Sequence, residues 1–466
     1  MVTVTRISLS TMPTISITNV GVFNGRTVEA WPTFSFDIST GEIMSPQSSA
    51  DKTIDGTGCT LIPGFIDAKI DAGAAPWAFP KFAAAGVTTV IDTSSETADA
   101  NAMRRSTSRV SGWPSYFASG SAAGRIGTPA WEGLRIFPYR SIDTVSSPVE
   151  AERFISKQVD GCDLIRVVID SPSLDDDTLG ALVNGTHQHG KLVIAHASQV
   201  QAYHRALAFG CEIITPVPIN AQLDSVTINS LREKGVTVVP SLALVRRVAA
   251  QHEYPSSAYK YAMANVRALS SAGVSICAGT SANDIRGLSI SFSDGIHEEL
   301  ELLVQAGLSN ADALRAATSI PAQAFGLLDR GTLEVGKRSD LTLLRGNPLS
   351  ELSAVCDVER VWINGVEFDR HVQGAEDLAG TISNRKYKAK DRWVPYETEG
   401  VRQAGDETKT ERHQQEDDIF VQSNDHRTGA NQEPSKELLL KLYDGATADL
   451  EDYLPELMAS TRLPKI

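Results

Sequence analysis

Three charged residues of the segment LIPGFIDAKID have types and a spacing that could do chemistry together. Asp67, Lys69 and Asp71 alternate along a predicted β-strand, so we expect their side chains to share one face. Two carboxylates favour the charged form of the amine between them, whereas desolvation favours the neutral form. A charged Lys69 could polarise a carbonyl, and a neutral one could form a Schiff base with it. The spacing predicts carbonyl chemistry with Asp71 orienting Lys69; an inactive salt-bridged cluster is the alternative.

A single histidine, His196, ends the apolar run KLVIAH. Imidazole titrates near neutral pH, so it can take or give a proton under ordinary conditions. We therefore expect His196 to act as the general acid/base. A purely structural histidine is the alternative.

Four further polar residues lie at the ends of other apolar runs. Asp92 ends VTTVID, Arg166 lies within DLIRVVID, and Ser281 and Asp284 follow GVSICAGT. We expect these four side chains to bind substrate. Arg166 could hold a substrate carboxylate through a bidentate pair, or it could pair with Asp67 or Asp92. Ser281 has no evident base in the sequence, so it is not predicted to be an activated nucleophile.

Alternating strand and helix patterns would bring these residues together. Eight short β-branched runs, from LIPGFIDAKID to GVSICAGTS, alternate with stretches of helical period. This α/β pattern predicts a (β/α)8 TIM barrel over residues 61–330, with active-site residues at the carboxyl ends of the strands. Strand-like flanks, residues 1–60 and 331–370, predict a small composite β-sandwich into which the barrel is inserted.

Charge and composition exclude several classes of protein. Asp and Glu number 57 against 43 Lys and Arg, a formal net charge of -14, which argues against nucleic-acid or anionic-membrane binding. No apolar run reaches the roughly 18 residues of a membrane span, and the first residues do not form a secretion signal. The 5 cysteines are scattered, which predicts neither a disulfide framework nor a Cys-x-x-Cys metal site. We expect a cytoplasmic protein.

The last part of the chain, residues 371–466, has a different character. Between residues 391 and 460 there are 17 acidic and 7 basic residues, which predicts a mostly flexible acidic extension. Apolar residues recur at helical spacing over about 435–460. That segment could pack on the barrel, or it could bind a protein partner or a second copy of the chain.

Residues 58–368 resemble the amidohydrolase superfamily, most closely its imidazolonepropionase-like and prolidase-like branch. The resemblance lies in LIPGFIDAKID, AAAGVTTVID, KLVIAHAS, GVSICAGTS and the long block from HEELELLVQAGL to DLTLLRGNPL. It implies a barrel inserted in a composite sandwich, and metal-dependent hydrolysis of cyclic amides or related C–N bonds.

The resemblance also implies a set of metal ligands, which this chain mostly lacks. The family places a His-x-His pair on strand 1, where Lys69 and Asp71 stand here. Arg166 stands near the bridging lysine of strand 4, Pro216 at the histidine of strand 6 and Ser281 at the aspartate of strand 8; His196 alone is retained. Lys and Arg side chains carry only donors and repel a divalent cation, so we expect no metal cofactor.

These observations predict an enzyme that acts on a small polar or cyclic molecule, at a C–N or C–C bond next to a carbonyl, without a binuclear metal centre. Two alternatives stay open. One is a non-catalytic pseudoenzyme that serves as a scaffold through its acidic tail. The other is a metal-dependent amidohydrolase with a single divalent ion such as Zn²⁺ held by Asp71, His196 and Asp284.

Overall fold

The computed structural model describes residues 13–47, 49–72, 75–127, 141–251, 255, 257–285 and 287–369. The acidic extension predicted over 371–466, with its helical segment about 435–460, lies outside the described residues, as does the predicted strand GLRIFPY. In the part of the chain that is described, no helix is both long enough and apolar enough to cross a membrane.

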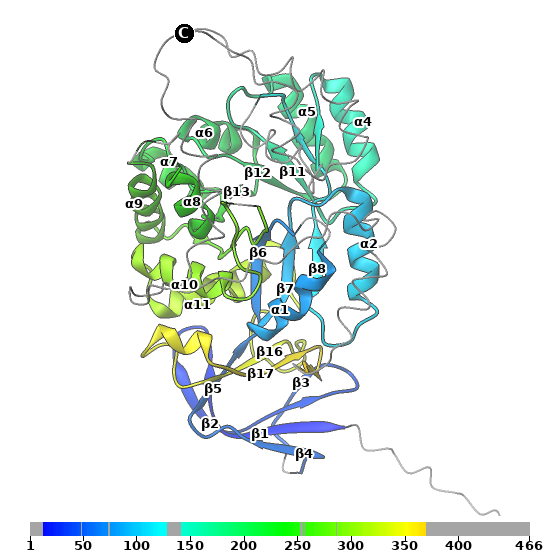
Figure 1. The fold of residues 1–466 in the computed structure, drawn as a ribbon, viewed down its shortest axis with the longest axis vertical. Coiled ribbons are helices and arrows are strands. Elements are labelled where there is room, and N and C mark those ends of the chain that lie inside the picture. Colours follow the sequence, from blue (N-terminus) through cyan, green and yellow to red (C-terminus); the bar gives the residue numbers. More distant parts are fainter. Residues whose placement is uncertain are drawn as a thin grey trace, which may run out of the picture. The chain divides into compact units, whose positions relative to one another are not determined.

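An eight-stranded, mostly antiparallel sheet combines strands from both flanks of the fold (Figure 1). The strands are β1 (Thr14–Phe23), β2 (Val28–Asp37), β3 (Ile43–Met44), β4 (Lys52–Asp55), β5 (Cys59–Pro63), β16 (Leu341–Arg345), β17 (Val358–Ile363) and β18 (Val366–Glu367). Their order is β18-β17-β16-β5-β1-β2-β3, with β4 paired to β1. The antiparallel β5–β16 ladder, from Leu341 opposite Pro63 to Arg345 opposite Cys59, joins the two flanks. Phe34, Phe36 and Trp362 anchor the apolar core of this sheet.

The central region consists of short parallel strands in two sheets. One sheet holds β6 (Phe65–Ile70), β7 (Val87–Asp92) and β8 (Ser115–Ala118). The other holds β9 (Ala122–Gly124), β10 (Ile142–Thr144), β11 (Leu164–Val168), β12 (Leu192–His196), β13 (Ile213–Thr215), β14 (Thr237–Val238) and β15 (Ser275–Ile276). Backbone hydrogen bonds connect the sheets at both ends, from Asp163 N to Ala118 O (2.8 Å) and from Ala68 N to Ala278 O (2.9 Å). Strand β8 is not among the runs found in the sequence.

Amphipathic helices follow most of these strands. They are α1 (Phe79–Ala84), α2 (Thr97–Thr107), α4 (Pro148–Gln158), α5 (Asp176–Gln188), α6 (Val200–Phe209), α7 (Ser225–Glu233), α8 (Leu242–Ala249), α9 (Ala258–Ser271), α10 (Gly295–Gln305), α11 (Asn310–Ala316) and α12 (Ser319–Ala324), with single 3-10 turns η1 (Pro76–Ala78) and η2 (Leu352–Cys356). Asp175 begins α5 and Asp224 begins α7 by accepting hydrogen bonds from backbone amides inside the helix. The apolar faces of the helices form one large buried core with the strands.

A separate cluster of buried apolar side chains connects the two parallel sheets. Its members come from β6, β7, β11, β12 and β13 and from the residues directly after β14 and β15: Ala68, Ile91, Leu164, Ile194, Ile213, Val239 and Cys277. Polar residues at the carboxyl ends of these strands therefore lie above an apolar floor.

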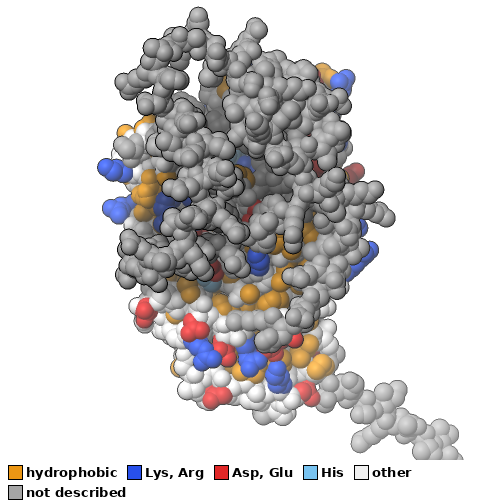
Figure 2. Space-filling view, in the orientation of Figure 1, with side chains coloured by type: hydrophobic (Ala, Val, Ile, Leu, Met, Phe, Trp, Pro, Cys, Tyr) orange, Lys and Arg blue, Asp and Glu red, His pale blue; other side chains and the backbone are white. Residues whose placement is uncertain are grey.

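Charges are mixed on the described surface that Figure 2 displays. Over the eight-stranded sheet, in the lower part of the view, Lys and Arg side chains alternate with Asp and Glu side chains. This visible face carries no broad basic surface of the kind that binds nucleic acid.

Candidate active site

The carboxyl end of β6 positions the central lysine. The β6–β7 register shifts between Asp67 and Ile70, and such an irregularity breaks the two-residue alternation of side chains. Asp67 accepts hydrogen bonds from the backbone of Lys69 (3.3 Å) and of Thr280 (3.0 Å) and from the Thr280 hydroxyl (2.7 Å). The Asp67 carboxylate is thus bound to Thr280 and to the backbone of Lys69, and not to the Lys69 amine.

Lys69 joins two polar side chains in the interior. Its Nζ lies 2.8 Å from Asp71 Oδ2 and 2.5 Å from Ser281 Oγ. Burial lowers the pKa of the Lys69 amine, an effect that Arg166 strengthens and Asp71 opposes. Ser281 has a left-handed backbone with φ of 55°, which is uncommon for a residue other than glycine and is found at functional sites. The structure thus brings the Lys69 amine into contact with the Ser281 hydroxyl, a pairing that the sequence did not reveal.

Asp71 is surrounded by donors. Oδ1 accepts from Thr93 Oγ1 (3.2 Å) and from the Ser94 hydroxyl, and it lies 3.8 Å from a terminal nitrogen of Arg166. Burial alone would raise the pKa of Asp71, but Lys69 and Arg166 outweigh it and hold this pKa well below its usual value. Asp71 is therefore an ionised group in contact with the Lys69 amine.

Arg166, on β11, uses both terminal nitrogens within the protein. Nη1 donates to the carbonyl of Thr93 (2.7 Å) and to Ser94 Oγ (3.0 Å), and Nη2 lies 3.0 Å from His196 Nδ1. Nε is buried without a partner among the described residues. A bidentate pair with a substrate carboxylate would compete with these bonds, and this role of Arg166 stays a prediction. No ion pair of Arg166 with Asp67 or Asp92 forms in the described part of the chain; the carboxylate near it is that of Asp71.

The contact with Arg166 fixes the state of His196, the last residue of β12. A guanidinium only donates, so Nδ1 must accept, and the proton of the neutral ring lies on Nε2, which is 3.6 Å from Asp170 Oδ2. Burial, with the charges of Arg166 and Lys69, lowers the pKa of His196 well below its usual value. A neutral ring with its proton on Nε2 can donate a hydrogen bond from that atom; the predicted role of His196 as general acid/base stays a prediction.

Asp92 does not belong to this cluster. It is completely buried and accepts from the backbone amide of Ser94 (3.0 Å), from the Ser95 hydroxyl and from Tyr116 Oη (2.8 Å). Burial raises its pKa. These three donors bind the carboxylate of Asp92 to the turn after β7 and to β8, and its substrate-binding role stays a prediction.

Asp284 is likewise separate from Lys69, Asp71 and His196. The structure gives it no hydrogen bond or ion pair with these residues, and Lys81 is the charge that acts on it. Burial raises the pKa of Asp284 to about 6. Its predicted substrate-binding role stays a prediction.

Four polar residues at this end of the strands were not predicted from the sequence as part of the site. Thr93 and Ser94 hold Asp71 and Arg166, and the polar run DTSS after an apolar strand was the available signal. Thr215 pairs with His196 in the β12–β13 register. The hydroxyls of Thr215 and Ser241 are buried without partners in the described part of the chain, so each could bind a ligand atom.

The residues at this site do not fit a divalent metal ion. Among the described residues, no group of three His, Cys, Asp or Glu side chains lies close enough together to hold one. The Lys69 amine lies beside Asp71, and Arg166 occupies the Nδ1 lone pair of His196. Two cationic side chains thus stand where ligands would be needed.

Known proteins resemble this chain over the same region. The model of the amidohydrolase family matches residues 60–367. An imidazolonepropionase from Deinococcus deserti is 29% identical over 187 residues, which are 40% of this chain and 43% of that relative, so less than half of its length is matched.

Solved structures agree in fold. A Xaa-Pro dipeptidase with bound methionine has a TM-score of 0.65 at 19% identity, over 76% of this chain and 99% of that one. An ochratoxinase from A. niger has a TM-score of 0.64 at 18% identity, over 76% and 95%. At these identities the likeness shows the fold alone. The family model, however, extends from β5 through β18 and covers well over half of the sequence, and on that ground the protein belongs to the amidohydrolase family.

Proposed function

We propose that the protein is a hydrolase that cleaves a C–N bond next to a carbonyl in a small polar or cyclic molecule, without the metal centre of its relatives. One observation carries the proposal: the buried amine of Lys69 contacts both Asp71 and Ser281. This arrangement supplies a base, a group that orients it and a hydroxyl nucleophile.

The proposal rests on a closed barrel. The hydrogen bonds that connect the two parallel sheets at both ends support a (β/α)8 barrel. The sheet that combines both flanks supports a composite domain of residues 1–60 and 331–370 around a barrel of residues 61–330. In such a fold the carboxyl ends of the strands form one mouth, where Lys69, Arg166 and His196 would meet a substrate.

The first half of the proposed reaction forms an ester on Ser281. Lys69 is charged beside the ionised Asp71, but its lowered pKa makes the neutral amine accessible. In that form Lys69 takes the proton of Ser281 Oγ as this oxygen attacks the substrate carbonyl. His196 Nε2–H and the unpartnered Arg166 Nε–H are the donors available for the oxyanion. The tetrahedral intermediate then expels the amine, which takes the proton from Lys69. Asp71 keeps the Lys69 amine in place.

Water completes the reaction in the second half. Lys69 takes a proton from a water molecule that attacks the ester, and it returns this proton to Ser281 Oγ as the acid leaves. Lys69, predicted as an electrophile or imine-forming amine, here acts as a base. Attack by the Lys69 amine itself, to form an imine with a carbonyl substrate, remains a distinct outcome of the test below.

The burial of the site limits the substrate. Ser281 is completely buried and Lys69 nearly so, whereas the side chains of His196 and Asp71 are 17% and 12% exposed. A substrate carbonyl has to pass these two side chains to reach Ser281. A small polar or cyclic molecule fits this constraint better than a peptide chain.

Covalent labelling tests the proposal without a known substrate. The purified protein is treated with p-nitrophenyl acetate or a small fluorophosphonate, and the intact mass and modified peptide are measured. We expect one adduct on Ser281, none in Ser281→Ala, and labelling slowed by about 100-fold or more in Lys69→Met, the effect of removing a general base. Ser35→Ala, which removes a buried serine of the eight-stranded sheet, should label like the parent. Equal labelling of the parent and Ser281→Ala would contradict the mechanism.

Two further experiments distinguish this mechanism from the imine mechanism and from the metal-dependent alternative. Borohydride reduction in the presence of small ketones should leave Lys69 unmodified; a reduced adduct there would favour the imine mechanism. Elemental analysis should find no stoichiometric Zn, Mn, Fe or Ni; a stoichiometric metal that is lost in Asp71→Ala or His196→Ala would favour the metal-dependent alternative.

A non-catalytic scaffold is the second candidate function. It is favoured because the charged groups of the site already have partners within the protein. Asp71 is bound by Lys69 and Ser94, and both terminal nitrogens of Arg166 have protein partners. Absence of any adduct, together with a protein complex lost on deletion of residues 371–466, would support it. A cytoplasmic location, homo-oligomers and a partner bound through the acidic tail stay predictions.

A further inference from the structure

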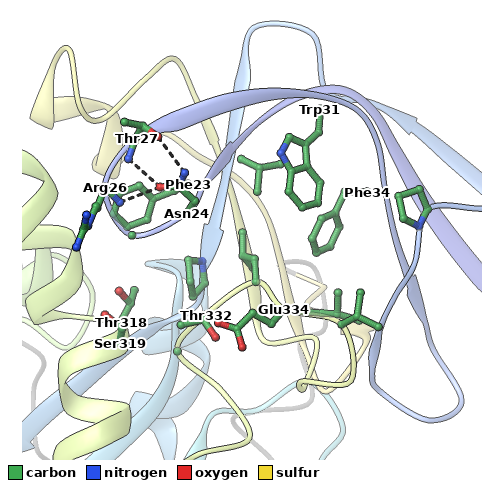
Figure 3. Close-up of a pocket in the computed structure, with 18 of the residues that line it drawn as sticks. Phe23, Asn24, Arg26, Thr27, Trp31, Phe34, Thr318, Ser319, Thr332 and Glu334 are labelled. Atoms are coloured by element: carbon green, nitrogen blue, oxygen red, sulfur yellow. Dashed lines mark hydrogen bonds between the residues drawn. The ribbon is translucent and has the colours of Figure 1, made fainter.

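A cavity lies in the eight-stranded sheet region, away from the candidate active site. It has a volume of about 1100 Å³ and is walled by the β1–β2 hairpin, the start of α12 and residues 331–335 (Figure 3). Pro63, at the end of β5, also lines it. Pro63 precedes β6, whereas Lys69 lies near the other end of that strand, about 20 Å away at the usual rise per residue. No residue of the Lys69 cluster lines this cavity.

One end of the cavity is apolar and aromatic. The rings of Trp31 and Phe34 lie with their centroids 6.1 Å apart at 38°, and Trp31 is only partly buried although it is large and apolar. Leu333 and Val335 add aliphatic surface, and Val335 is exposed. Phe34 itself is buried in the core of the sheet. A flat apolar group placed here would therefore mainly cover Trp31, Leu333 and Val335, which are still partly or largely exposed.

The opposite end carries a positive charge. Figure 3 shows Arg26 on the same side of the cavity as Thr318 and Ser319, and Trp31 and Phe34 on the other side. Arg26 makes no ion pair with any described residue. Its turn is fixed by the Asn24 side chain, whose Oδ1 accepts from the amides of Arg26 and Thr27, both at 2.9 Å. The guanidinium is therefore presented on a defined turn and has no counter-ion in the described part.

The other charges of the lining are already paired. Arg315 lies 3.1 Å from Asp312, and Glu334 lies 3.7 Å from Lys337 with its side chain largely exposed. The hydroxyl of Thr332 is buried without a partner among the described residues, so the wall between the two ends also offers a polar group. The unbalanced charge of the cavity is thus the positive one of Arg26.

We propose that this cavity binds an amphipathic organic anion, with a flat apolar body against Trp31 and Phe34 and a carboxylate or sulfonate at Arg26. The charge selects an anion, and the aromatic end selects a ring system over a simple inorganic ion. This binding site is independent of the proposed chemistry at Lys69.

A pair of fluorescent probes tests the proposal on the full-length protein. The anion 8-anilinonaphthalene-1-sulfonate and its uncharged analogue N-phenyl-1-naphthylamine differ by the sulfonate. Both are titrated against the parent, Arg26→Gln, Trp31→Ala and the control Arg345→Gln, whose arginine is exposed on β16 and does not line the cavity.

We expect saturable binding of the sulfonate at one site, weakened about 10-fold in Arg26→Gln and by more salt. The uncharged analogue should bind the parent and Arg26→Gln alike, and Trp31→Ala should weaken both probes. Arg345→Gln and Lys69→Met should bind as the parent does, whether or not the chemistry at Lys69 is correct. Non-saturable binding, or an unchanged sulfonate affinity in Arg26→Gln with its fold intact by circular dichroism, would overturn the proposal.

Discussion

Replacing Arg166 with methionine should destabilise the fold strongly and should raise the pKa of His196. The guanidinium donates to the Thr93 carbonyl, to Ser94 Oγ and to His196 Nδ1 at 2.7, 3.0 and 3.0 Å. Hydrogen bonds from a charged group contribute about 1.5–3 kcal/mol each, so three exceed about 4 kcal/mol before the cost of burying the guanidinium. Removing one partner of a buried charged network costs about 3–5 kcal/mol. We therefore expect Arg166→Met to lower the free energy of unfolding by about 3–5 kcal/mol.

The same change should raise the pKa of His196. Arg166 is, after burial, the largest cause of the lowered pKa of this histidine. Without the guanidinium, Nδ1 is free to accept a proton, so the imidazole should titrate closer to its ordinary value. Lys69 remains nearby and keeps the pKa from rising fully.

Two measurements check this prediction. Urea unfolding followed by circular dichroism gives the free-energy change, and NMR of the imidazole C–H signals gives the pKa of His196. The control is Arg345→Met, whose side chain is 60% exposed beside Glu359 and should cost no more than about 1 kcal/mol. The proposed contact, and the tautomer derived from it, would be refuted if Arg166→Met lost no more free energy of unfolding than the control and the pKa of His196 did not rise.

Three further predictions follow from the buried charges. Burial raises the pKa of Asp67 from 3.8 to about 7. The free energy of unfolding should therefore fall as pH rises between these two values, by at most about 4 kcal/mol. In urea unfolding, Asp67→Asn should lose less stability than the parent between pH 4 and 8, and an equal loss would contradict this. The pKa of Asp71 is lowered, so its contribution to the free energy of unfolding is present above its ordinary pKa and is lost as pH falls. Lys69→Met should therefore make acid unfolding depend less steeply on pH. An unchanged or steeper dependence would count against the Lys69–Asp71 contact. Added Zn²⁺ should leave the melting temperature unchanged, and a rise abolished by His196→Ala would contradict a metal-independent site.

The sequence was sufficient to identify the residues at the carboxyl end of the first parallel strand. Lys69 and Asp71 are brought together as predicted, since residues two apart on a strand can share a face and their charges attract. His196 was also placed at the end of its strand. The alternation of strand and helix patterns predicted the parallel region, although strand β8 was missed because its run SYFA is too short to show a period.

Family membership and the types of the site residues were thus determined by the sequence, because the long blocks and local periodicity are properties of neighbouring residues. Only the tertiary structure decided the partners. The Asp67 carboxylate accepts from Thr280 and from the backbone of Lys69 but not from the Lys69 amine. Ser281, 212 positions away in the chain, becomes the partner of that amine. Arg166 likewise contacts His196 and Asp71, and not the predicted partners Asp67 or Asp92. Such contacts depend on strand register and on competition for buried donors and acceptors, which arise only when distant segments pack together.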